Sequence, residues 1–144
     1  MKVDIGHFKL EVDVDRTREF YKTWHPITQD CDCASCKNYI KAIEVIPENV
    51  KHFFEKLGID MYKEAEVMIP LKVEDGKLMY SVFYHLVGKI MSCENPKNSV
   101  EISDGFSVWF SNGCDLIPEQ FPKPVVQMFL YAKLPWLLDE ECNY

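Results

Sequence analysis

Hydrophobic and polar residues alternate along the start of the chain. Residues 8–14 follow a strict apolar–polar alternation, whereas Val3 and Ile5 lie on the opposite parity. A period of two is typical of a half-buried β-strand, because successive side chains point to opposite faces. We therefore predict a strand in this region, with a bulge or bend at Gly6 and His7 where the strand changes face.

The next part of the chain has the 3.6-residue period of amphipathic helices. Asp15 is a suitable N-cap for a short first helix. A second helix is predicted to begin near Ala34. Apolar residues at i, i+3, i+4 and i+7 between Val50 and Leu57 predict a third helix, and Gly58 follows it as the residue that closes its C-terminal end.

The second half of the chain has the pattern of β-strands. Asp-Gly pairs at 75–76 and 104–105 each separate two apolar runs, which is a strong hairpin signal. Residues 78–90 are apolar on both faces, which predicts a central strand, and residues 125–134 alternate again. We therefore expect an α+β fold: an antiparallel, twisted sheet of about five or six strands, with two or three helices packed on one face.

The composition agrees with one domain over residues 1–144. The chain has 144 residues, of which 47% are apolar, enough for a single core. Its formal net charge is −7, from 16 Lys and Arg against 23 Asp and Glu. A basic face is the expected footprint of nucleic-acid or anionic-lipid binding, so we expect neither a nucleic-acid nor a membrane partner. A protein partner or a homodimer is compatible with this charge.

The start of the chain lacks the apolar run of a secretory signal, and no stretch approaches the length of a membrane span. We therefore expect a cytoplasmic location. Cysteines in a reducing compartment are normally free, so the six cysteines of the chain are first interpreted as ligands or redox centres and not as a disulfide framework.

Three of these cysteines lie within six positions, at Cys31, Cys33 and Cys36. Zinc sites use short spacings because one loop can then deliver several ligands to one tetrahedron. The first interpretation is therefore a zinc site formed by the three thiolates. A fourth ligand must come from elsewhere in the chain. His25 is the nearest candidate, and the more distant ones are His85, Cys93 and Cys114. Half of the usual zinc signature is missing, because the chain has no second C-x-x-C and no pair of closely spaced histidines.

Two other interpretations of the cluster remain open. Cys33-x-x-Cys36 at a helix start is the arrangement of thiol redox proteins, although those place it after a strand. Alternatively, Cys33 and Cys36 continue the apolar stripe of Ile40 and Ile43, and both thiols are simply buried. Burial explains Cys31 least well.

The neighbours of Cys31 are acidic. Asp30 and Asp32 flank it, and nearby carboxylates oppose a thiolate unless a cation is bound there. The positive end of the helix that begins near Ala34 acts in the opposite direction on the other two thiols.

Little else in the sequence carries chemistry. Motifs of serine hydrolases, zinc metalloproteases and nucleotide-binding proteins are missing. His85 is expected to be a core residue more often than a base or ligand, and a dyad of Cys114 with His85 has no support in the sequence. Five aromatic residues on or beside strands could form a protein-binding sheet face: Tyr80, Tyr84, Trp109, Tyr131 and Trp136.

Several motifs together resemble a known family. They are the D-C-x-C-x-x-C-x-N-[FY] stretch that ends at Tyr39, the Y-H-x-V-G strand at 84–88, and the L-P-W at 134–136. In these motifs the chain is similar to a family of small uncharacterised bacterial proteins, mainly from Gram-positive bacteria. The resemblance implies a bacterial cytosolic protein and no established activity. It therefore supplies no catalytic residue.

The leading hypothesis from the sequence is a small non-enzymatic domain that binds zinc through the cysteine cluster, with a structural or partner-recognition role. The alternatives are a thiol redox sensor that uses Cys33 and Cys36, and a metal-free adaptor that binds a protein through its aromatic sheet face.

Overall fold

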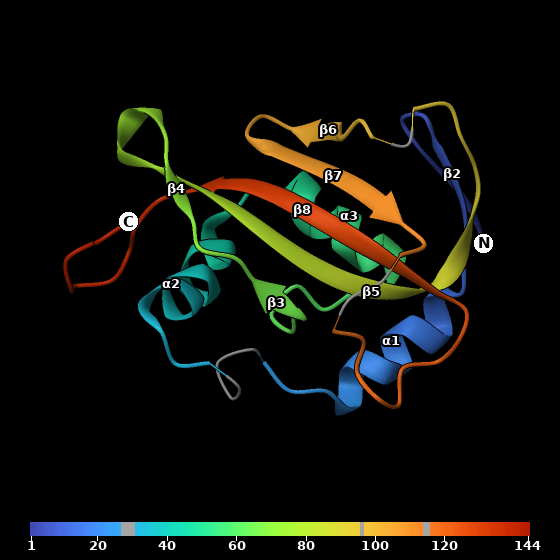
Figure 1. Ribbon diagram of the computed structural model, residues 1–144. Coiled ribbons are helices and arrows are strands. Elements are labelled where there is room, and N and C mark those ends of the chain that lie inside the picture. Colours follow the sequence, from blue (N-terminus) through green and yellow to red (C-terminus); the bar gives the residue numbers. More distant parts are fainter. Residues whose placement is uncertain (27–30, 96, 114–115) are drawn as a thin grey trace.

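The computed structural model describes residues 1–26, 31–95, 97–113 and 116–144 (Figure 1). In chain order the elements are β1 (Lys2–Ile5), β2 (Phe8–Val12), α1 (Val14–Thr23), α2 (Ala34–Ala42), the 3₁₀-helix η2 (Ile43–Val45), α3 (Glu48–Leu57), β3 (Glu66–Val67), β4 (Leu71–Lys72), the 3₁₀-helix η3 (Glu74–Gly76), β5 (Leu78–Cys93), β6 (Val100–Ser103), β7 (Phe106–Ser111) and β8 (Val125–Leu134).

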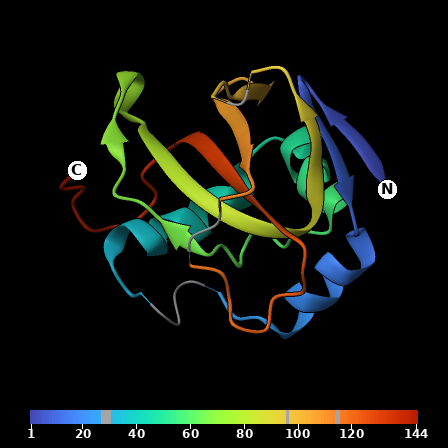
Figure 2. The ribbon, with the colours of Figure 1, turned by 45° about the vertical axis from the view of Figure 1, so that its right-hand side comes forward.

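The strands form one open antiparallel sheet in the order β1-β2-β5-β8-β7-β6, and the short strands β3 and β4 also pair with β5. The 16-residue β5 curves through the whole molecule (Figure 2). Its first ten residues pair with β8 and its last part pairs with β2. The α+β class is confirmed. The sheet has eight strands instead of five or six, because β3 and β4 are separate two-residue strands along β5.

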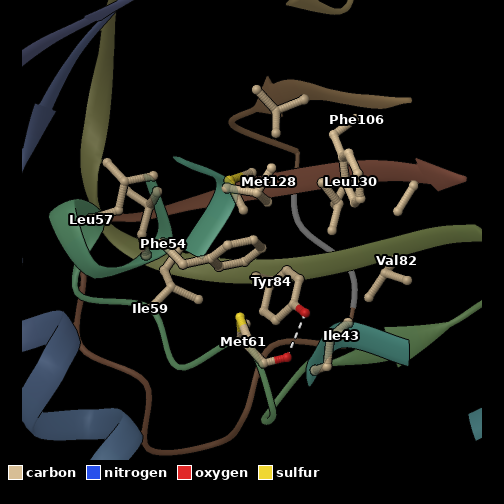
Figure 3. Packing of buried hydrophobic residues seen from close by; sticks show 14 of the residues in the cluster. Ile43, Phe54, Leu57, Ile59, Met61, Val82, Tyr84, Phe106, Met128 and Leu130 are labelled. Carbon is tan, nitrogen blue, oxygen red and sulfur yellow. Dashed lines mark hydrogen bonds between the residues drawn. The ribbon is translucent and has the colours of Figure 1, made fainter. Parts of the chain in front are cut away.

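The main core lies between one face of the sheet and helices α2 and α3. The Phe54 ring of α3 packs edge-on against Tyr84 of β5 with ring centroids 5.0 Å apart (Figure 3). Tyr84 donates its hydroxyl hydrogen to the Met61 carbonyl at 2.7 Å, so this buried polar group is satisfied. The apolar side chains that alternate along β5 and β8 therefore pack in one layer with those that recur every 3.6 residues along α3.

Helix α1 lies against the edge of β5, between the part that pairs with β3 and the part that pairs with β2. The Tyr21 hydroxyl donates to the His85 carbonyl at 2.7 Å, and the Val87 backbone NH donates to the Thr17 hydroxyl at 2.9 Å. Side chains of α1 thus satisfy backbone groups of β5 that no neighbouring strand reaches.

Two local predictions at the start of the chain are wrong. Asp13, and not Asp15, caps α1, because its side chain accepts a hydrogen bond from the Arg16 backbone NH at 3.1 Å. Gly6 and His7 form no bulge but a tight turn between β1 and β2, which pair as a hairpin. Gly6 has φ of 56°, a left-handed conformation that glycine adopts without a steric cost.

Candidate metal centre

The three clustered cysteines lie where the chain enters α2. Cys33 is the N-cap residue, with extended φ and ψ of −67° and 161°, and Cys36 is in the first helical turn. Residues three apart lie on the same side of a helix, so the local backbone alone brings these two thiols together. Cys31 adds a third from the preceding segment. The three Sγ atoms all lie within 4.8 Å of one another.

These separations are close to those of a metal site. A tetrahedral zinc ion with Zn–S bonds of about 2.3 Å holds its sulfur ligands about 3.8 Å apart. The Cys31 and Cys33 Sγ atoms lie 3.1 Å apart, and the limit of 4.8 Å on every pair is about 1 Å wider than the ideal. Small side-chain rotations are therefore enough to place the three sulfur atoms around one ion.

The two thiols at the helix start differ in environment. Cys36 is 1% exposed, and burial raises the pKa of its thiol, with further contributions from Cys33 and Cys31. Cys33 is exposed. Its slight burial acts against the thiolate, but hydrogen bonds from the Ser35 hydroxyl, the Cys31 thiol and the Cys36 backbone NH outweigh it and lower the pKa of Cys33 to about 7. The cluster thus contains one sulfur that ionises readily, that of Cys33, and one buried sulfur that stays neutral, that of Cys36.

Hydrogen bonds join the start of α2 to strand β5 of the sheet. The Tyr80 hydroxyl on β5 donates to the Ser35 carbonyl at 3.1 Å and accepts a hydrogen bond from Asn38 Nδ2 at 3.1 Å. Asn38 is fully buried and also binds the segment after β8: its Nδ2 donates to the Pro135 carbonyl at 3.1 Å, and its Oδ1 accepts from the Leu137 backbone NH at 2.6 Å. These hydrogen bonds join the helix that carries Cys36 to β5 and to the segment after β8.

The predicted histidine ligands lie elsewhere. Neither His25 nor His85 belongs to the group of three sulfur atoms. The His25 ring stacks on Trp24 with centroids 4.4 Å apart. His85 is 1% exposed in the middle of β5, where its Nε2 lies 3.2 Å from Gln127 Oε1 on β8. The sequence expectation that His85 is a core residue fits this position.

The interpretation of the clustered cysteines as buried core residues fits some of them and not others. Burial accounts for Cys36 but not for Cys33, which is exposed, whereas Cys31 is half-buried against the core. Within the described ranges, all five cysteines are free thiols: Cys31, Cys33, Cys36, Cys93 and Cys142. Asp30 and Cys114 lie outside the described residues. The Cys114–His85 dyad also falls outside them, because it requires Cys114.

The aromatic sheet face is divided by the fold. Tyr80 and Tyr84 are fully buried beneath the helices, so they are not available to a partner. Trp109 lies on the other face, where its ring packs against Phe129 with centroids 4.7 Å apart. Of the five predicted residues, the half-buried Trp109, Tyr131 and Trp136 remain as candidates for an adaptor surface.

Sequence reasoning missed the residues that surround the cluster. Asn38 lies inside the quoted cysteine motif, but its hydrogen bonds to Pro135 span 97 residues and leave no trace in local periodicity.

No helix in the described portion is long and apolar enough to cross a membrane. The chain matches no protein-family model, and comparisons with curated proteins and with solved structures give no match either. The geometry of the cysteine cluster is therefore the main guide to function.

Proposed function

We propose that this protein binds one zinc ion through Cys31, Cys33 and Cys36, and that the ion has a structural or partner-recognition role. One observation carries the proposal: three thiol sulfur atoms lie within 4.8 Å of one another at the start of a helix that is tied to the sheet. As the sequence led us to expect, we place the protein in the cytoplasm, where thiols stay reduced and available to a metal.

Zinc is the metal that this donor set suits best among common cellular ions. Thiolates are soft ligands, and a tetrahedral all-sulfur or mixed sulfur site is typical of zinc. The positive end of α2 favours thiolates at Cys33 and Cys36, which helps to offset the cost of ionising a buried thiol. The bound ion would fix the segment before α2 to its first turn, so its contribution would be to stabilise this corner of the fold.

The test is the metal content of protein purified without added zinc. We expect close to one equivalent in the wild type and little in a Cys33→Ser/Cys36→Ser double variant. A Cys93→Ser variant is the matched control, because Cys93 is a half-buried thiol at the far end of β5, opposite Phe8. Less than about a tenth of an equivalent in the wild type would contradict the proposal, given the affinity of structural zinc sites.

A thiol redox sensor is the second candidate. It is favoured by the exposure of Cys33 and by the position of its sulfur within 4.8 Å of the Cys36 sulfur. In this case a peroxide-type oxidant would accept two electrons from Cys33 and Cys36 as their disulfide forms and two protons leave the thiols. Mild oxidation should then remove two free thiols reversibly from the metal-free wild type and none from a Cys31→Ser/Cys36→Ser double variant, in which Cys33 keeps neither neighbouring thiol.

A further inference from the structure

The segment that follows β8, residues 135–144, is held to the rest of the fold by few contacts. None of its residues is buried, and none belongs to a helix or strand. Trp136 and Tyr144 pack against the core cluster and against each other, with ring centroids 5.9 Å apart. Figures 1 and 2 both show this red segment beside α2. A short stretch with so little burial opens more easily than the strands of the sheet, so it has two states, docked and released.

Asn38 of α2 makes the hydrogen bonds that dock this segment. Its Nδ2 donates to the Pro135 carbonyl at 3.1 Å, and its Oδ1 accepts from the Leu137 backbone NH at 2.6 Å. Nδ2 also donates to the Tyr80 hydroxyl at 3.1 Å. Both hydrogens of this fully buried amide are thus in use, and the segment docks only when the amide has this orientation.

The Tyr80 hydroxyl sets the orientation of the Asn38 amide. It has a single hydrogen, which it donates to the Ser35 carbonyl at 3.1 Å. Only its lone pairs then remain for Asn38, so Asn38 turns its NH2 group, and not its oxygen, towards Tyr80. Without the Ser35 carbonyl, the hydroxyl would be free to donate to Asn38 Oδ1, and that oxygen would be lost to Leu137. The Ser35 carbonyl in its observed place therefore favours the docked segment.

Ser35 belongs to the part of α2 that carries the cysteine cluster. It lies between Cys33 and Cys36 in the first turn, and its Oγ lies 3.3 Å from the Cys33 Sγ. Cys33 is the N-cap residue, and sulfur is a weaker acceptor than the side-chain oxygen of the usual N-cap residues, so this turn is weakly capped. An ion bound by both thiolates would join the N-cap to the first turn and hold the Ser35 carbonyl in place between them.

We infer that metal binding at the cysteine cluster controls the docking of segment 135–144, through the hydrogen-bonded chain of Ser35, Tyr80 and Asn38. This inference rests on the proposed zinc-binding function and names the element through which the ion acts on the rest of the molecule. The metal-bound protein keeps the segment on α2, whereas loss of the metal releases it and uncovers the amide of Asn38. Coupling between two sites is reciprocal, so docking of the segment raises the metal affinity of the cluster by the same factor.

Hydrogen exchange at the Leu137 backbone NH tests this coupling in the reduced, folded wild type. The exchange rate is measured in metal-free protein and after addition of one equivalent of zinc. We expect zinc to slow the exchange about fivefold or more, the lower end of the usual coupling between linked sites. The internal control is the Asn98 backbone NH, which binds the Asn95 carbonyl in the turn between β5 and β6 and should exchange at the same rate in both samples.

A Tyr80→Phe variant interrupts the chain in its middle and keeps the buried ring. It should still bind zinc, about fivefold more weakly, and zinc should no longer slow the exchange at Leu137. Tyr21→Phe is the matched control, because it removes another buried hydroxyl, which donates to the His85 carbonyl and makes no contact with α2. It should keep both the zinc affinity and the zinc-dependent protection of the wild type.

The outcomes separate this inference from the proposed function. Zinc that binds to the wild type without slowing the exchange at Leu137 would overturn the inference and leave the proposed function intact, and this measurement needs no variant. Zinc-dependent protection that persists in Tyr80→Phe would also overturn it, because the chain through Tyr80 would then not be the link. Failure of the folded wild type to bind zinc would overturn the proposed function, and the inference with it.

Discussion

At the scale of single residues, two cysteines three positions apart have opposite properties. Cys33 caps α2 from outside and is exposed, whereas Cys36 is one turn further on and points into the core. Only the thiolate is a nucleophile, so pKa and exposure together decide which thiol reacts. Both factors favour Cys33.

We therefore predict that Cys33 is alkylated first in the reduced, metal-free protein. Its rate with iodoacetamide should rise with pH and level off above about 7, where its thiolate becomes the main form. Cys36 should stay unmodified over the same range. Mass mapping of the labelled sites checks this. Equal labelling of the two thiols under native conditions would contradict the assignment, and added zinc should protect both.

Glu64, on the loop between α3 and β3, is the second residue with an unusual environment. It is 1% exposed, and among the described residues neither of its carboxylate oxygens accepts a hydrogen bond from a neighbour. Burial raises its pKa from the ordinary value of 4.5 to about 8; its own backbone NH offsets this in part, and Asp60 adds to it. Glu64 is therefore protonated in the folded protein at neutral pH.

This gives a pH dependence with a definite sign. The folded state binds more protons than the unfolded chain between pH 4.5 and about 8, so stability is fully present below 4.5 and is lost as the pH rises through about 8. The slope is at most about 1.4 kcal/mol per pH unit. Urea unfolding of a Glu64→Gln variant should lack this slope, whatever its absolute stability. The control Glu55→Gln, at an exposed position of α3, should keep the slope.

At the scale of elements, the sequence predicted what depends on near neighbours. The apolar face between Val50 and Leu57 and the closing Gly58 gave α3 almost to the residue, since Gly58 has the left-handed φ of 79°. The first arm of the hairpin around Asp75 and Gly76 was predicted less well. It is divided into β3 and β4, with Pro70, which cannot donate to a ladder, between them.

In the candidate site, too, the sequence predicts only what depends on near neighbours in the chain. That Cys33 and Cys36 lie together is a property of one helical turn, so the sequence could predict it. The exposure of Cys33 was not predicted, because the stripe with Ile40 and Ile43 continues only as far as the helix does, and Cys33 is its cap. The role of Asn38 depends on the segment that returns after β8, and no local pattern encodes that contact.

Asn38 gives the prediction that belongs to this scale. An Asn38→Ala variant removes hydrogen bonds to Tyr80, Pro135 and Leu137, so the free energy of unfolding should fall by about 2 to 3 kcal/mol. The matched control is Asn49→Ala on α3, whose amide makes two long, exposed contacts: it donates to the Ile102 carbonyl at 3.4 Å and accepts from the Ser103 hydroxyl at 3.5 Å. It should change stability by less than about 0.5 kcal/mol. Equal losses in the two variants would show that Asn38 does not join α2 to the segment after β8.

At the scale of the whole molecule, β5 joins two parts of the sheet. Its pairing with β8 ends at Val87, and its pairing with β2 covers Gly88 to Cys93. The strand therefore changes its neighbour at Gly88, which is also where the backbone NH binds the Pro124 carbonyl at 3.0 Å. The apolar pattern at 78–90 predicts most of this strand but not its change of partner, because pairing depends on residues far apart in the chain.

Gly88 is required because β2 approaches too closely for any side chain. A Cβ atom there would lie 2.2 Å from the Glu11 carbonyl oxygen, which is fixed backbone. Gly88→Ala should therefore lower the free energy of unfolding by about 3 kcal/mol or more, since the two strands must separate. Gly76→Ala is the control: a Cβ there meets nothing within 4 Å, so only its φ of 69° adds strain, about 1 to 2 kcal/mol. A smaller loss for Gly88→Ala than for Gly76→Ala, measured by urea unfolding, would mean that the contact between β2 and β5 can relax enough to accept a methyl group at position 88.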